Sequence, residues 1–250
     1  MRERWRSGLT LLGSVLLLAV VVVIGPGNEL AAVRRVLGIG NDPLGTPAEV
    51  VPGGVHAFLR HQPGDPDEPV AWDPCREVRY EINPDGAPGD PDDAVAFVQE
   101  AVDVVSGLTG LQFDYLGETD RRPSWKADLV PRGSREPVLV AWATEDEVEE
   151  LSGNVAGVGG AVAQSDTRGG RLRYVTGQVT LDSDVYDRLG GDPDGRARGR
   201  AILLHELGHL VGLDHVDSPG ELMYADEVGL LDFGTGDRNG LVRLGKGQCG

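Results

Sequence analysis

The residues best suited to catalysis lie in one short segment toward the C-terminal end of the chain. The sequence of residues 205–215 is H-E-L-G-H-L-V-G-L-D-H, and it contains three of the chain's five histidines. On a helix, residues four apart differ by about 40° in rotation and roughly 6 Å along the axis, so His205 and His209 can reach one metal ion. Gly212 permits the left-handed turn that ends a helix, which allows His215 to supply a third ligand.

The types of these residues point to hydrolysis at a zinc ion. Three protein ligands with one open position are typical of catalytic zinc, whereas structural zinc sites close with four protein ligands. Glu206 projects beside the two helical histidines, where its carboxylate can take a proton from a zinc-activated water. We therefore predict that His205, His209 and His215 are the metal ligands and that Glu206 is the catalytic base.

Two alternatives remain open at this point. Glu227 lies eighteen residues after His209 and could replace His215 as the third ligand, as in a thermolysin-like zinc protease. The chain could instead be a non-catalytic surface binding module that keeps zinc only for folding. An open coordination position beside Glu206 favours an enzyme over that module.

The pattern of apolar residues predicts the elements that must position this site. A helix is predicted from Arg196 through Leu210, and a second, amphipathic helix follows the N-cap residue Asp90. Alternating or continuous apolar runs predict strands, and a run of acidic residues predicts a solvated helix face. The strands are expected at 78–82, 111–116, 138–143, 155–164 and 174–181, and the acidic run lies at 145–150. Alternating strands and helices indicate an α+β class with α/β-like character.

Composition limits the class of partner. The chain has 250 residues, of which 40% are hydrophobic, so it can bury a core. Its 40 acidic and 23 basic residues give a formal net charge of -17, which repels phosphate backbones. There is no G-x-x-x-x-G-K-[ST] loop and no well-placed G-x-G-x-x-G. We therefore predict that neither nucleic acid nor a nucleotide is a partner.

The N-terminal residues predict a membrane segment. Three arginines, Arg2, Arg4 and Arg6, precede an apolar run over residues 9–24. As a helix this run spans about 25 Å, near the short end of what crosses a bilayer. Residues 1–25 are therefore predicted as a signal anchor or a signal peptide, with the rest of the chain outside the cytoplasm. The expected location is the cell membrane, in a single pass, or the extracellular space if the segment is cleaved.

Residues 26–71 are rich in proline, glycine and aspartate, and this composition predicts a flexible linker. His56 and His61 lie in this linker and are expected to be solvated. A latency segment that reaches the active site is the alternative. The catalytic domain is then predicted to occupy residues 72–250.

The two cysteines, Cys75 and Cys249, are too few for a tetrathiolate zinc site. Outside the cytoplasm, thiols pair, so we predict a disulfide between them. Closing so long a loop stabilises the folded chain by roughly 4–5 kcal/mol in the chain-entropy model.

The pattern at 205–215, followed by Leu222-Met223-Tyr224, is the metzincin signature. Its spacing resembles that of the matrixin-type metzincins, and residues 234–244 resemble the closing helix of those proteins. The resemblance covers about residues 72–250. It implies a zinc-dependent endopeptidase whose partner is a protein or peptide substrate. It also implies a metzincin catalytic domain with a twisted, mostly parallel five-stranded sheet and three helices.

The resemblance also implies roles for residues around the substrate. One edge strand, at about 157–163, would face the cleft and bind a peptide as an added antiparallel strand, with Gly159, Gly160 and Ala161 beside it. Met223 would form a hydrophobic floor under the zinc. Tyr224 would shape the wall of the substrate pocket.

The resemblance further bears on the number of metal ions. Animal matrixins hold a second, structural zinc on histidines upstream of the active-site helix, but no histidine lies between His61 and His205. One catalytic zinc is therefore expected. The resemblance also allows calcium at Asp182 or Asp184, with a solvated loop as the alternative.

Overall fold

The computed structural model describes residues 42–125, 136–165, 170–225 and 229–249. Residues 44–248 form one compact unit, and the rest of the chain forms another, of which the structure describes little. Within the described residues, no helix combines the length and the apolar character that a membrane span requires. The predicted membrane segment at 1–25 lies outside them.

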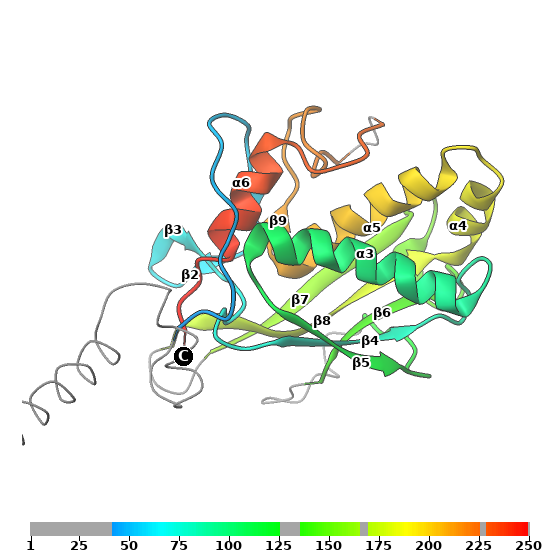
Figure 1. Cartoon of the computed structure of the whole chain (residues 1–250), viewed down its shortest axis with the longest axis horizontal. Helices are drawn as coiled ribbons and strands as arrows, with labels where there is room; N and C mark the ends of the chain where they lie inside the picture. Colours follow the sequence, from blue (N-terminus) through cyan, green and yellow to red (C-terminus); the bar gives the residue numbers. More distant parts are fainter. Residues whose placement is uncertain (1–41, 126–135, 166–169, 226–228, 250) are drawn as a thin grey trace, which may run out of the picture. The chain divides into compact units, whose positions relative to one another are not determined.

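The compact unit is built on a five-stranded sheet with the strand order β5-β4-β6-β8-β7. Neighbouring strands are parallel except for the last pair, in which β7 runs antiparallel to β8 at the edge of the sheet (Figure 1). This arrangement confirms the expected mostly parallel sheet. The strands are β4 (Val78–Asn83), β5 (Phe113–Glu118), β6 (Val138–Ala143), β7 (Gly157–Ser165) and β8 (Leu172–Asp182).

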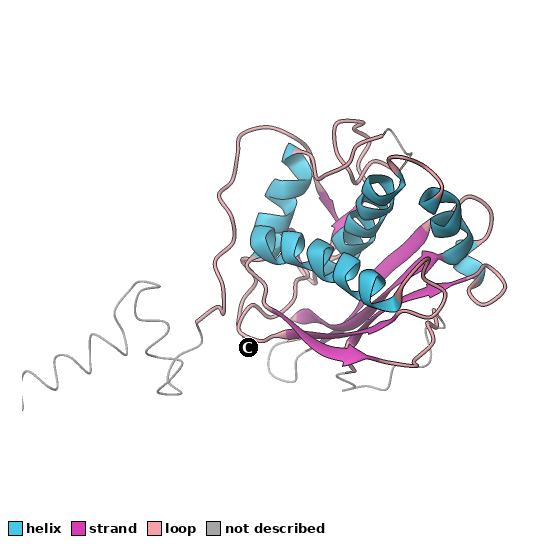
Figure 2. Cartoon of the chain, turned by 45° about the vertical axis from the view of Figure 1, so that its right-hand side comes forward, coloured by secondary structure: helices cyan, strands magenta, loops and turns pink. Residues whose placement is uncertain are grey.

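Four α-helices are described, and they gather on one face of the sheet (Figure 2). They are α3 (Pro91–Thr109), α4 (Ser183–Gly190), α5 (Gly195–Val211) and α6 (Thr235–Leu244). The expected number was three, and α4 is the helix that the sequence reasoning missed. It forms because Asp182, at the end of β8, accepts a hydrogen bond from Val185 N and so caps the first turn.

Local sequence explains the two long helices. Asp90 caps α3 through Asp92 N, and a proline occupies the first turn, where a missing N–H costs nothing. Gly110, with φ of 72°, ends that helix in the left-handed conformation. The leucines of α5 are almost fully buried, because this helix lies between the sheet and its neighbouring helices; they are Leu203, Leu204, Leu207 and Leu210.

The acidic run at 145–150 forms no α-helix. The structure places a short 3-10 helix, η3 (Glu149–Leu151), at its end. Val148 and Leu151 are buried there, in a small cluster with Ala143. These apolar anchors hold the loop in a compact turn instead of a regular solvated helix.

The structure also differs from the predicted linker at 26–71. From residue 44 onward this segment belongs to the compact unit and contains β1 (Ala57–Phe58), β2 (His61–Gln62) and β3 (Asp65–Pro69). Val70 is fully buried. A composition rich in proline and glycine does not distinguish a free linker from an extended segment that packs closely on a domain. We call residues 44–62 the strap.

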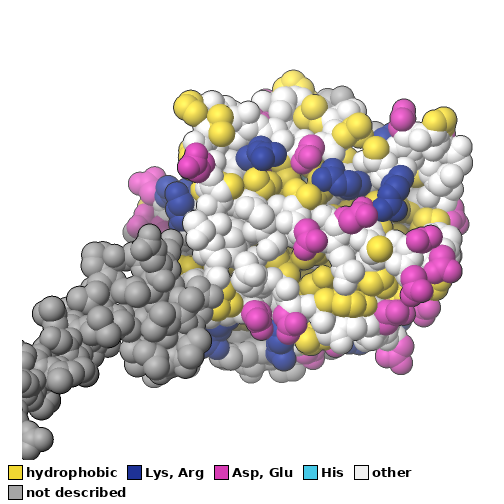
Figure 3. Space-filling model, in the orientation of Figure 1, with side chains coloured by type: hydrophobic (Ala, Val, Ile, Leu, Met, Phe, Trp, Pro, Cys, Tyr) yellow, Lys and Arg dark blue, Asp and Glu magenta, His cyan; other side chains and the backbone are white. Residues whose placement is uncertain are grey.

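Charges on the surface are unevenly distributed. Figure 3 shows acidic side chains gathered on the side where α4 and the start of α3 lie. The first turns of these helices contribute Asp92, Asp93 and Asp184. Acidic residues near helix N-termini are favoured by the helix dipole, so part of the negative charge stabilises the fold.

Candidate active site

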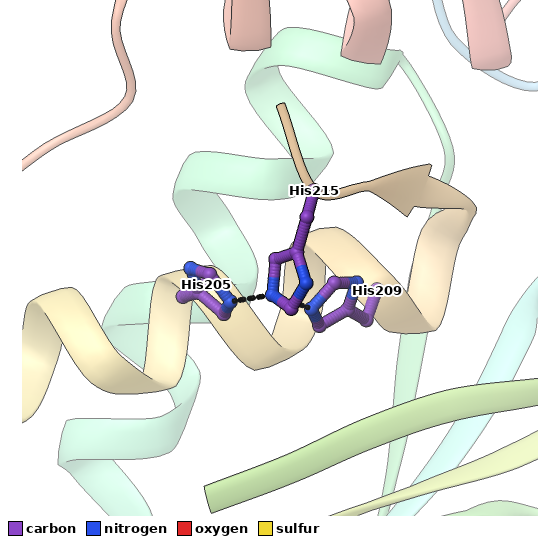
Figure 4. A group of neighbouring side chains, drawn as sticks. All are labelled: His205, His209 and His215. Atoms are coloured by element: carbon purple, nitrogen blue, oxygen red, sulfur yellow. Dashed lines mark hydrogen bonds between the residues drawn. The ribbon is translucent and has the colours of Figure 1, made fainter. Parts of the chain in front are cut away.

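Helix α5 carries His205 and His209 one turn apart, and Figure 4 shows the ring of His215 between theirs. The helix ends at Gly212, whose φ of 122° reverses the backbone. A Cβ there would also meet Tyr174 and Leu244 at 3.0 and 3.1 Å. Only glycine fits this turn, and the short strand β9 (Leu213–Asp214) then brings His215 back over the helix.

The three histidines converge on one point. The Nε2 atom of His215 lies 3.1 Å from the Nε2 atoms of both His205 and His209. For zinc bound at about 2.05 Å in tetrahedral geometry, ligand nitrogens lie roughly 3.3 Å apart. The spacing of the three nitrogens therefore suits one zinc ion, and these residues form a group that could hold a metal.

Backbone carbonyls fix the orientation of two of the rings. His205 Nδ1 lies 2.8 Å from Leu222 O, and His209 Nδ1 lies 2.9 Å from Leu213 O. A carbonyl can only accept, so Nδ1 carries the proton and Nε2 keeps its lone pair for the metal. Burial lowers the pKa of His209 to about 4 and also lowers the pKa of His205. Both rings are thus neutral at pH 7, which is the form that binds metal.

Glu206 lies beside the histidines but under the edge strand. It is buried, and its carboxylate accepts a hydrogen bond from the backbone N–H of Gly159 in β7. Two glycines make this contact possible, because a Cβ at Gly159 would lie 2.1 Å from Glu206 O and a Cβ at Gly157 would lie 2.9 Å from Glu206 Cγ. Burial raises the pKa of the Glu206 carboxyl to about 8. A zinc ion beside it would favour the carboxylate form.

A family model agrees with this geometry. The model for matrixins, peptidase M10, matches residues 71–228, which is more than half of the chain. The chain belongs to the matrixin family. It is therefore a zinc metalloendopeptidase, a hydrolase that acts on proteins or peptides. A comparison with curated proteins found no match.

In this matrixin the predicted methionine lies below the metal-binding helix. Met223 is 1% exposed and packs against α5 where the helix has a glycine, since a Cβ at Gly208 would lie 2.7 Å from Met223 Sδ. The glycine inside the histidine motif therefore makes room for the methionine. The histidine pattern alone does not indicate this role of Gly208.

Two buried acidic residues hold the turn around Met223, and the sequence reasoning missed both. Asp237 accepts hydrogen bonds from the backbone N–H groups of Leu222, Met223 and Gly234. Glu221 accepts hydrogen bonds from the first N–H groups of α6. The position of Asp237 three residues after the N-cap of α6 is typical of a capping box, and that signal could have identified it.

The residues predicted to contact substrate lie in two places. Strand β7 pairs, among the described residues, with β8 alone, so its other edge can accept a peptide. Gly159 faces α5, whereas Gly160 faces Trp125 on the other side of the sheet and Ala161 packs against the core. Tyr224 directly follows Met223 and forms an isolated bridge with Val216, close after the third histidine.

The remaining site predictions have different outcomes. Asp182 is engaged as the N-cap of α4, and Asp184 is exposed, so calcium at either residue stays a prediction. Glu227, the alternative third ligand, lies outside the described residues. Cys75 and Cys249, which were predicted to pair, are both disulfide-bonded.

Proposed function

We propose that this matrixin cleaves peptide bonds in extracytoplasmic proteins, with zinc held by His205, His209 and His215 and with Glu206 as the general base. The observation that carries the proposal is the convergence of the three Nε2 atoms beside a buried glutamate. When bound, the zinc supplies Lewis-acid chemistry, which acidifies a water molecule and polarises the scissile carbonyl. The surrounding residues must orient the peptide and carry protons.

Glu206 is suited to carry the proton. Its carboxylate is held at one side by the N–H of Gly159, which fixes its direction, and its burial keeps bulk water from competing for the proton. Burial alone raises the pKa of Glu206, and a zinc ion beside it would offset this shift and keep the carboxylate ionised, so that it can accept a proton. Glu206 therefore takes a proton during attack and returns it to the leaving nitrogen of the substrate.

The edge of β7 that pairs with no described strand is suited to hold the substrate. A peptide that adds to this edge as an antiparallel strand runs alongside β7. It passes the N-terminal part of the strand, where Gly157 and Gly159 approach Glu206. The scissile bond is thereby presented to the base and to the histidines. Tyr224, which is half-buried, contributes to the pocket for a substrate side chain.

The extracytoplasmic location rests on two features of the chain. Arg2, Arg4 and Arg6 precede a run of apolar residues long enough to act as a signal or an anchor. Both cysteines are disulfide-bonded, which is typical of proteins in oxidising compartments. We propose a single-pass membrane protein whose catalytic unit lies outside the cytoplasm, released if the segment is cleaved. N-terminal sequencing of the mature protein distinguishes the anchored form from the cleaved one.

The direct test is cleavage of a complex peptide library, read by mass spectrometry, with the full chain and with Glu206→Ala. The variant should retain zinc, because no ligand is changed, and should lose activity by roughly three or more orders of magnitude. Zinc content is measured for both proteins by elemental analysis. Turnover retained in the variant would contradict the role of Glu206. Absence of cleavage by the zinc-loaded wild type would favour the binding module.

A further inference from the structure

The strap is fixed to the catalytic unit at several points along its length. Near its start, Ala48 N donates to Leu108 O at the end of α3. Farther along, the side chain of Asn239 in α6 donates to Val51 O and Gly53 O at 2.7 and 2.9 Å, and its Oδ1 accepts from Val51 N. The strap is thus tied to α6 by one amide side chain that satisfies three backbone groups.

Glu221 is the second tie. Its carboxylate is buried and accepts Val55 N of the strap at 3.2 Å with one oxygen. The other oxygen accepts Gly236 N and Asp237 N, the first N–H groups of α6, at 2.8 and 3.1 Å. The backbones of the strap and α6 also meet closely here, since a Cβ at Gly236 would lie 2.0 Å from Val55 O. One carboxylate therefore joins the strap, the helix and the turn that leads to Met223.

Beyond Glu221 the strap reaches the segment that carries the third histidine. Strand β1 pairs antiparallel with β9, with Ala57 opposite Asp214 and Phe58 opposite Leu213. Leu59 N then donates to Gly212 O at 3.0 Å. The residue that follows β9 is His215. The strap therefore supports the backbone on which the third ligand is placed.

The two carbonyls that orient the other histidines lie in the same network. Leu213 O, which holds His209, belongs to β9, and Leu222 O, which holds His205, follows Glu221 directly. Groups that hydrogen-bond to a metal ligand in this way fix its tautomer and direction, and their loss weakens metal binding. All three histidines thus depend on backbone that the strap and Glu221 hold in place.

We propose that Glu221 is a positioning residue that acts through the strap and the Met223 turn to hold the three histidines in their metal-binding arrangement. Its carboxylate binds backbone N–H groups of the strap and α6, so its effect on the histidines is indirect. We expect it to slow the release of the metal and to raise kcat. This inference rests on the proposed zinc site, but its readouts are separate from peptide cleavage.

The test compares metal dissociation in the full-length protein loaded with zinc or with cobalt. Glu221→Ala should raise the rate of zinc loss to a chelator by about tenfold and alter the visible absorption of bound cobalt. Glu221→Gln, which keeps one acceptor oxygen, should lie between wild type and Glu221→Ala. Asn239→Ala, which loosens the strap from its other tie, should change metal release in the same direction by a smaller factor. In each variant kcat should fall while KM changes little.

Glu68→Ala is the matched control. Glu68 lies in β3, in the same N-terminal region, and forms an ion pair with Arg171. Arg171 directly precedes β8, whose first residue pairs with Ser165, at the opposite end of β7 from the glycines that approach Glu206. Its loss should leave zinc release and the cobalt spectrum as in wild type. If Glu221→Ala lowers the melting temperature but leaves zinc release and the cobalt spectrum unchanged, Glu221 is only structural and the inference is overturned.

The remaining outcomes also decide the question. If Glu221→Ala does not fold, the milder Asn239→Ala decides it, and unchanged metal release in that variant overturns the inference. The metal readouts hold even if the wild type cuts no peptide, a result that would overturn the proposed protease function alone. A wild type that binds neither zinc nor cobalt would overturn both.

Discussion

Gly159 and Gly160 of β7 face different neighbours, because successive residues of a strand point to opposite faces of the sheet. Gly159 faces α5, and its missing side chain lets the backbone of Glu206 approach the strand. Gly160 faces Trp125, which a Cβ would meet at 3.4 Å, an ordinary contact. Glycines inside a strand are typical of a close approach by another backbone, and the packing shows that here the approaching element is the catalytic helix α5.

This difference gives a matched pair of substitutions. Gly159→Ala forces β7 and α5 apart, and overpacking of this kind destabilises by about 1–3 kcal/mol. Because it also moves Glu206 relative to the substrate edge, we expect kcat/KM to fall by about 100-fold. Gly160→Ala should change both quantities little. The measurements are thermal unfolding and cleavage of one library-derived peptide; equal effects of the two variants would contradict the assigned contact.

At the scale of elements, the helices and strands that follow from the local pattern of apolar residues could be predicted from the sequence. Helix α5 was expected at 196–210 and is observed at Gly195–Val211, and the strands of the main sheet were expected close to their observed bounds. The ligand set followed from helix geometry and one glycine turn. These features depend on residues within a few positions of one another.

The elements that were missed depend on distant partners or on short signals. The two-residue strands β1 and β9 exist only because segments far apart in the sequence meet, and no local pattern marks them. Glu221 and Asp237 are buried although charged, since backbone N–H groups surround them. Charged residues are mostly exposed, and the sequence does not show which backbone N–H groups will bind these two carboxylates. Their burial could therefore not be predicted.

Helix α4 gives a prediction at this scale. Asp182→Ala removes the side chain that accepts Val185 N, and the loss of an N-cap costs about 1 kcal/mol. The control is Asp184→Ala, an exposed neighbour in the first turn of the same helix. Unfolding is followed with added calcium and with a calcium chelator. An effect of Asp182→Ala that appears only with calcium would show that the residue is a metal ligand and not mainly a cap.

At the scale of the whole molecule, one covalent link acts on stability. Cys75 and Cys249 are both disulfide-bonded, and the chain between them is long. Reduction with a phosphine should therefore lower the free energy of unfolding by roughly 4–5 kcal/mol. The double variant Cys75→Ser with Cys249→Ser should be equally unstable with and without reductant. Two reactive thiols in denatured, unreduced wild type would contradict the prediction.

The strap also shows that a recognisable sequence and a folding unit can have different limits. The family match begins at residue 71, whereas the compact unit begins at Leu44. A recombinant fragment cut at the start of the match would lose β1 and leave the edge of β9 without its partner. Exposed strand edges invite pairing between molecules, so such a fragment would tend to aggregate. Expression should therefore start ahead of residue 44, although the catalytic motif lies far downstream.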